Sequence, residues 1–190
     1  MDMPVQNAQL SPVLRAAHFA AHKHKMQRRR DADATPYINH PIALAVLLAN
    51  EAKIDDPVVL CAALLHDTVE DTETTFAELE AEFGAEIAEI VREVTDDTSL
   101  AKAERKRLQV ERAARISRRA KLVKLADKIC NLRDIETAPP VGWSEQRKDE
   151  YVAWAAQVVA GLRGVHGGLE EIFDAVVKRW QECRAAKNDL

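Results

Sequence analysis

The chain has 190 residues, which is the size of one domain or of two small ones. It contains 31 alanines but only 6 glycines and 7 prolines, which favours helices and argues against a β-sandwich, a β-barrel or a glycine-rich nucleotide loop. The net charge of −4 and the lack of an apolar stretch of ~20 residues argue against a protein that coats nucleic acid or spans a membrane. Three scattered cysteines, without an N-terminal signal segment, predict a cytoplasmic location.

Helix signals recur along the first half of the chain. Ser11-Pro12 and Asp56-Pro57 each place a capping side chain before a proline suited to the first helical turn, so a helix is predicted to begin at each pair. Residues 58–65, VVLCAALL, are apolar on every side. Such a segment predicts a central helix that neighbours cover on all faces.

The second half also has the spacing of helices. Thr75 and Glu78 have the spacing of a capping box. Apolar residues step by three and four from 151 to 162 and again through a C-terminal helix expected at about 169–185. No alternating β pattern is present. The prediction is an all-α fold of about eight helices, with residues 1–190 forming a single domain.

Charged residues are concentrated in three blocks. Residues 66–97 carry twelve acids and one base, residues 102–133 carry twelve bases and three acids, and residues 23–30 carry five bases and no acid. Each block could be a solvated helix face. Alternatively, the fold brings a carboxylate-rich, metal-binding region against cationic walls, an arrangement that suits a phosphate-rich substrate.

The apolar segment 58–65 ends abruptly in the sequence HDTVED. Buried charge must be paired or must coordinate metal, so such an ending needs a reason. On a single continuous helix, His66 and Glu70 are four residues apart, and so are Asp67 and Asp71. One side of the helix end would then present an imidazole and several carboxylates. The alternative is an exposed, acidic helix end.

Two other segments supply candidate partners. His40 stands just before a proline suited to a helix start, although a lone histidine is more often structural. Asp127 lies in an otherwise apolar helical stretch, with Asn131 four residues on and on the same face. Asp127 could instead pair with Lys124 or Lys128.

These segments together offer four candidate metal ligands: His40, His66, Asp67 and Asp127. Imidazole suits transition metals and carboxylates suit harder ions such as Mn²⁺ and Mg²⁺, while the lack of thiolate argues against a structural zinc site. Four ligands leave positions open for water and substrate. Glu70 and Asp71 follow one turn later, where they could orient or deprotonate that water.

The histidine and aspartate pattern is similar to that of the HD phosphohydrolase superfamily. The segments PYINHP, AALLHDTVEDT, VTDD, ERKRLQVE, AKLVKLADKICNLRD and GWSEQR most resemble the hydrolase domain of the RelA/SpoT family, in particular its small stand-alone members. The resemblance runs from about residue 19 to residue 161 and implies an HD-domain helical bundle. It also implies a Mn-dependent (p)ppGpp 3′-pyrophosphohydrolase that yields GDP or GTP and pyrophosphate.

Roles carry over by position from this resemblance. The four candidate ligands would hold one manganese ion, and Glu70 and Asp71 would be the catalytic acids. The substrate-binding residues would be Arg29, Arg30, Lys102, Asn131, Arg147 and Tyr151. The sequence MQRRRDADATPY departs from the GQxRKSGEPY pattern of the long bacterial enzymes. This departure leaves open which of Arg28, Arg29 and Arg30 contacts the base.

Other functions remain possible from the sequence. A stand-alone member of this family could remove the 2′-phosphate of NADPH with the same ligands. A helical module could bind nucleic acid through residues 102–133 without catalysis, or an HD fold could be kept for structure alone. The expected partner is a guanine nucleotide, with no nucleic acid and no membrane, and the protein is expected to be a monomer or a homodimer.

Overall fold

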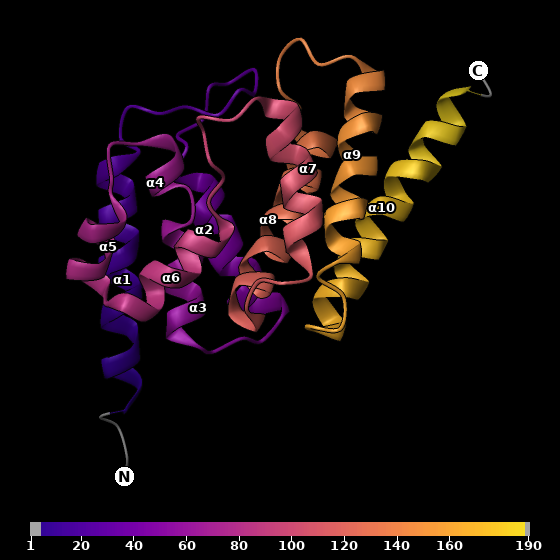
Figure 1. Cartoon of the computed structure of the whole chain (residues 1–190). Coiled ribbons are helices and arrows are strands. Elements are labelled where there is room, and N and C mark those ends of the chain that lie inside the picture. Colours follow the sequence, from indigo (N-terminus) through magenta and orange to yellow (C-terminus); the bar gives the residue numbers. More distant parts are fainter. Residues whose placement is uncertain (1–4, 189–190) are drawn as a thin grey trace.

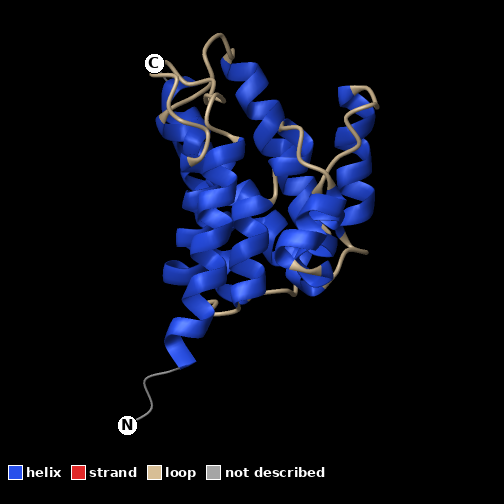
Figure 2. Cartoon of the chain, turned by 90° about the vertical axis from the view of Figure 1, so that its left-hand side faces the viewer, coloured by secondary structure: helices blue, strands red, loops and turns tan. Residues whose placement is uncertain are grey.

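The computed structural model describes residues 5–188, which form helices joined by loops and contain no strand (Figures 1 and 2). The predicted all-α fold is confirmed. The sequence predicts about eight helices, and the described residues form more, because a single turn follows α3 and Gly84 (φ 86°) separates α5 from α6. The helices are α1 (Val5–Lys23), α2 (Asn39–Val46), α3 (Pro57–Leu65), α4 (Thr68–Asp71), α5 (Phe76–Phe83), α6 (Ala85–Val94), α7 (Lys102–Ala113), α8 (Arg118–Thr137), α9 (Glu145–Ala160) and α10 (Gly167–Asn188), and the π-helical segment η1 (Leu47–Glu51) continues α2.

The apolar segment 58–65 forms α3, which α1, α2, α6 and α8 surround. Asp56 caps the helix by accepting a hydrogen bond from the Val58 backbone N–H at 2.9 Å, and Pro57 occupies the first turn. All residues from Cys61 to Leu65 are buried. The predicted central helix and its start at Asp56-Pro57 are therefore confirmed.

A second central helix, α8, contacts α2, α3, α6, α9 and α10. Ser117 caps it by accepting a hydrogen bond from the Ala120 backbone N–H at 3.2 Å. Its buried face is apolar except at Asp127 and Lys128. Because α3 and α8 pack together, the end of α3 lies near the middle of α8, where those two charges are buried.

The first helix begins earlier than the sequence predicts. A start at Ser11-Pro12 is wrong, because α1 is already helical at Val5 and contains Pro12 in its interior. Pro12 removes one backbone hydrogen bond and crowds the preceding turn, but the segment from Val5 to Leu10 contains no glycine or proline to stop the helix. Residues 1–4 and 189–190 of the predicted domain lie outside the described residues.

Two long helices complete the molecule on the side away from α1 (Figure 1). Ser144 caps α9 by accepting a hydrogen bond from the Arg147 backbone N–H at 3.2 Å, and α10 covers the expected C-terminal helix. The outer helix α7 packs mainly against α9. Within residues 5–188, no helix is both long enough and apolar enough to cross a membrane.

The contact between α7 and α9 depends on a glycine at the end of α9. A Cβ atom on Gly161 would lie 2.8 Å from the Ala113 Cβ and 3.0 Å from the Ala114 backbone nitrogen. We expect Gly161→Ala to lower the free energy of unfolding by about 1–3 kcal/mol, because the two helices must separate. Chemical denaturation measures this change.

Gly167→Ala is the matched control, because a Cβ at Gly167 meets no atom within 4 Å. Its free energy of unfolding should stay within about 1 kcal/mol of the native value. Equal stability of the Gly161→Ala and Gly167→Ala variants would contradict the close approach of α7 and α9.

Candidate active site

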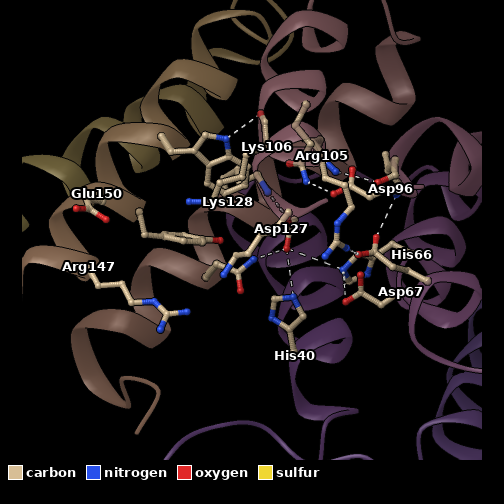
Figure 3. Close-up of a pocket in the computed structure, with 18 of the residues that line it drawn as sticks. His40, His66, Asp67, Asp96, Arg105, Lys106, Asp127, Lys128, Arg147 and Glu150 are labelled. Carbon is tan, nitrogen blue, oxygen red and sulfur yellow. Dashed lines mark hydrogen bonds and ion pairs between the residues drawn. The ribbon is translucent and has the colours of Figure 1, made fainter. Parts of the chain in front are cut away.

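A cavity of about 620 Å³, here called the first cavity, opens between the end of α3, the middle of α8 and the inner faces of α7 and α9. Figure 3 shows its polar side chains converging from these elements. The carboxylates of Asp67, Glu70 and Asp96 line it together with basic side chains from α7, α8 and α9. The acidic and basic blocks of the sequence therefore meet across one space.

Potential metal ligands line one part of this cavity. One ligand atom from each of His40, His66 and Asp67 lies within 4.8 Å of the others. His40 belongs to the first turn of α2, whereas His66 and Asp67 form the turn between α3 and α4. Two segments that are distant in sequence thus bring three donor groups together.

The single continuous helix expected through HDTVED is wrong, because the chain turns at His66 and Asp67 before α4 begins. The side chains there bind the final carbonyls of α3. His66 Nδ1 hydrogen-bonds the Ala63 carbonyl at 2.8 Å, and the Thr68 hydroxyl donates to the Leu65 carbonyl at 2.7 Å. These bonds replace backbone N–H donors that would continue the helix.

The donor set fits a cation. A carbonyl oxygen only accepts, so Nδ1 of His66 donates to Ala63 and leaves Nε2 as the free position of the ring. This Nε2 is buried, 2.8 Å from Asp67 Oδ2 and 3.9 Å from Asp127 Oδ1. Burial lowers the pKa of His66, but the two carboxylates outweigh it and raise the pKa to about 9. The site therefore favours positive charge at this point.

Asp127 stays charged although it is buried. Its carboxylate accepts hydrogen bonds from the Asn131 amide at 2.5 Å and from the Lys128 ammonium at 3.0 Å, and its Oδ1 lies 3.3 Å from His40 Nε2. Burial alone would raise the pKa of Asp127, but Lys128, His40 and His66 together hold it well below the ordinary value. Asn131 thus lies on the same face as Asp127, as the spacing predicts.

The two predicted catalytic acids point to different places. Glu70 lines the first cavity, where its carboxylate accepts hydrogen bonds from the Asp96 backbone N–H at 3.1 Å and from Arg105 at 3.4 Å. Burial, with the charges of Asp96 and Asp67, raises the pKa of Glu70 to about 7. A carboxyl group with this pKa can exchange a proton near neutral pH.

Asp71 is exposed and accepts a hydrogen bond from the Gln27 amide at 2.8 Å. It lines a second cavity of about 600 Å³, which also contains Arg29 and Arg30. The two cavities share Tyr37, His40, Asn131, Trp143 and Tyr151 in their linings. The predicted site residues therefore occupy two neighbouring cavities that meet at the candidate metal ligands.

Six basic side chains line the first cavity: Lys102, Arg105, Lys106, Lys124, Lys128 and Arg147. Burial and the neighbouring Arg147 lower the pKa of Lys102, and burial and Lys102 lower the pKa of Lys106. Burial is the larger cause of both lowered pKa values, and repulsion between these neighbouring cations adds to it. A bound anion with several charges would relieve that repulsion.

The structure adds residues for which the sequence suggested no role in the site. The Tyr37 hydroxyl donates to Asp67 Oδ2 at 2.6 Å, and burial with the charges of Asp67 and Asp71 raises the pKa of Tyr37 well above its ordinary value. Lys106 and Lys128 lie over the Trp154 ring, 4.7 Å and 4.5 Å from its centroid. Further additions to the first cavity are Asp96, Arg105, Gln109 and Trp143.

Signals for several of these residues are present in the sequence. Tyr37 belongs to PYINHP, Asp96 to VTDD, and Arg105 with Lys106 to ERKRLQVE. Lys128 is itself a signal, because a lysine in an apolar helical face must find a counter-charge. Trp154 gives a weaker signal, because a tryptophan at helical spacing is equally typical of a core.

Comparison with known proteins identifies relatives of the whole arrangement. The HD domain family model matches residues 16–168. The guanosine-3′,5′-bis(diphosphate) 3′-pyrophosphohydrolases MESH1 of Homo sapiens and Xenopus tropicalis are 58% and 59% identical to this chain. The matches cover 90% and 85% of this chain and 96% and 90% of those proteins.

A solved structure is also similar. It is described as a metazoan ortholog of SpoT that hydrolyzes ppGpp and plays a role in starvation responses. It superposes with a TM-score of 0.86 and 50% identity, over 88% of this chain and 94% of that one. With a family model that spans the site and relatives that match over most of their length, the chain belongs to the HD-domain family and is closely related to the MESH1 pyrophosphohydrolases.

Proposed function

We propose that the chain hydrolyses ppGpp and pppGpp to GDP or GTP and pyrophosphate. The observation that carries this proposal is the lining of the first cavity, where potential metal ligands stand beside six basic side chains. A nucleotide with pyrophosphate groups on two positions supplies the anionic charge that such a lining neutralises. The MESH1 relatives are named for this reaction.

We propose that the metal is manganese and that four side chains hold it: His40, His66, Asp67 and Asp127. Two imidazole nitrogens and two carboxylate oxygens suit this ion. When bound, it would polarise a phosphoryl oxygen and lower the pKa of a water molecule. The Tyr37 hydroxyl orients Asp67 through the 2.6 Å hydrogen bond, and Asn131 orients Asp127 through the 2.5 Å one.

Glu70 is proposed to accept a proton from the attacking water. Its carboxylate faces the first cavity, and its pKa of about 7 makes it an effective base near neutral pH. The Asp96 backbone N–H and Arg105 fix its orientation. The water attacks the phosphorus attached to the 3′-oxygen, and the bond between that phosphorus and the 3′-oxygen breaks to release pyrophosphate. The departing 3′-oxygen takes up a proton from solvent and leaves as the 3′-hydroxyl, which balances the proton that Glu70 accepts from the attacking water.

The remaining predicted residues divide between the two cavities. Lys102 and Arg147 belong to the cationic wall that would neutralise phosphate groups. Arg29 and Arg30 line the second cavity, where they would contact the base and nearby phosphates. The shared positions of Asn131 and Tyr151 suit the ribose and the phosphates attached to it.

We further propose that this reaction takes place in the cytoplasm, in a monomer or a homodimer. The free thiols of Cys61, Cys130 and Cys183 support a reducing compartment. The balance of acids and bases in the first cavity favours a small polyphosphate over a nucleic-acid backbone.

The direct test compares ppGpp and NADPH as substrates, each with and without Mn²⁺. We expect GDP and pyrophosphate from ppGpp only with the metal, and a larger kcat/KM for ppGpp than for NADPH. A larger kcat/KM for NADPH, with orthophosphate as product, would instead identify a 2′-phosphatase. Lack of turnover of both nucleotides would contradict the proposal.

The metal site is tested by Asp127→Asn, which removes one carboxylate oxygen but preserves side-chain volume. We expect Mn²⁺ affinity to fall at least about tenfold and kcat/KM at least about 100-fold. Glu136→Gln is the control, because Glu136 lies on the same helix and pairs with Arg179. Normal metal binding and turnover in Asp127→Asn would rule out the assigned ligand set.

Glu70→Gln tests the proposed base by kinetics. We expect kcat to fall by about 10²–10⁴-fold, because glutamine cannot accept the proton, while Mn²⁺ affinity stays unchanged. A kcat within about twofold of the native value would exclude Glu70 as the base.

The same variant should also change how the stability of the metal-free protein depends on pH. The folded-state pKa of about 7 lies above the ordinary 4.5, so protonated Glu70 stabilises the fold below the ordinary pKa, and this contribution is lost as the pH rises through about 7. Glutamine carries no charge. The free energy of unfolding of Glu70→Gln, relative to that of the native chain, should therefore rise by about 1–3 kcal/mol as the pH increases from about 5 to about 8. The exposed Glu80→Gln variant should show no such gain.

A further inference from the structure

His24 is a buried histidine that the proposed reaction leaves without a role. It follows α1 directly, only 2% of its surface is exposed, and it belongs to neither cavity lining. Its backbone N–H donates to the Ala20 carbonyl at 2.9 Å, and its carbonyl accepts from the Gln27 N–H at 2.9 Å. These bonds fix the backbone of His24 in the turn that leads to the second cavity.

The hydrogen bonds around this ring have a defined direction. The Asp71 carboxylate can only accept, so the Gln27 amide nitrogen faces it at 2.8 Å. The Gln27 amide oxygen must then face His24 Nδ1, at 2.6 Å. Because that oxygen accepts, Nδ1 of His24 carries the proton. A chain of donors therefore runs from His24 through Gln27 to Asp71.

The other ring nitrogen of His24 has no partner. Its Nε2 is buried and makes no hydrogen bond among the described residues. A buried, unpaired polar atom is unfavourable, so an apolar side chain would fill this space at lower cost. Packing alone therefore does not explain a histidine at this position. The hydrogen bond that Nδ1 donates to Gln27 does explain it.

The same ring supports a second residue of the site. Its centroid lies 4.9 Å from that of the Tyr37 ring, and the Tyr37 hydroxyl donates to Asp67 Oδ2 at 2.6 Å. Arg29 lies near the same tyrosine, with its guanidinium carbon 5.6 Å from the ring centroid. His24 therefore contacts Asp67 indirectly through Tyr37 and contacts Asp71 indirectly through Gln27.

We propose that His24 is a positioning residue that, through Gln27, holds the Asp71 carboxylate in the orientation that the reaction needs. This inference rests on the proposed hydrolysis and on the role of catalytic acid that the family resemblance implies for Asp71. Asp71 is exposed, and the Gln27 amide is the hydrogen-bond donor that restrains its side chain. Loss of the Nδ1 donor would free the Gln27 amide to turn and release Asp71.

The kinetic test compares two substitutions of His24 in the manganese-loaded protein. His24→Leu fills the space but donates no hydrogen bond, whereas His24→Asn places an amide N–H near the former Nδ1. We expect His24→Leu to lower kcat for ppGpp about tenfold, with KM within twofold, and His24→Asn to recover most of that loss. The control His22→Leu, at an exposed position of α1, should retain native kinetics.

A double-substitution cycle tests the route through Gln27. We expect Gln27→Leu to lower kcat by a factor similar to that of His24→Leu, and the double variant to be no slower than either single one. The proposal would be overturned if the losses of kcat from His24→Leu and Gln27→Leu multiply in the double variant. It would also be overturned if His24→Leu leaves kcat unchanged, or if His24→Leu and His24→Asn lower kcat equally. Thermal melting of each variant confirms that the folded protein is compared.

Nitrogen-15 NMR of the histidine rings gives a readout that needs no substrate. We expect His24 to carry its proton on Nδ1 in the native chain and to lose that preference in Gln27→Leu. A native proton on Nε2 would overturn the inference even if ppGpp is hydrolysed. If the native chain leaves ppGpp intact, the proposed function fails, and the tautomer of His24 alone decides whether the donor chain exists.

Discussion

The carboxylate of Asp127 carries a charge on the otherwise mostly apolar buried face of α8, and much of the site is arranged around that charge. A buried carboxylate is tolerated only with compensating partners. Lys128 and Asn131 supply two of them from the same helix, and His40 supplies a third from α2. Lys128 in turn lies over the ring of Trp154 on α9. The candidate metal centre and the cationic wall are thus linked through one buried ion pair.

This arrangement explains why a mildly acidic chain can suit a polyphosphate. The acidic block 66–97 contributes carboxylates to one side of the first cavity, and the basic block 102–133 contributes most of its cations. The third block contributes Arg28, Arg29 and Arg30 to the second cavity. Many other charges in the same blocks are on the surface, such as the exposed pair of Arg107 and Glu104. The blocks therefore combine both of the roles that the sequence suggested.

The sequence predicts the features that depend on local pattern. The apolar run 58–65, the capping residue Asp56 and the spacing of Asp127 with Asn131 all appear as expected. The turn at His66 is not predictable in this way, because no glycine or proline marks it. Side-chain bonds to the carbonyls of Ala63 and Leu65 end the helix there. Glu70 and Asp71 line different cavities because they are neighbours within α4, and neighbouring helical residues do not share a face. The position of His24 depends on contacts across the fold.

The proposed hydrolysis breaks one particular bond: water attacks the phosphorus attached to the 3′-oxygen, and the nucleotide leaves with its 3′-hydroxyl. Hydrolysis of ppGpp in ¹⁸O-labelled water, followed by mass spectrometry of both products, tests this claim most directly. We expect one ¹⁸O atom in the pyrophosphate and none in the GDP. Label in the GDP, or label in released orthophosphate, would contradict it.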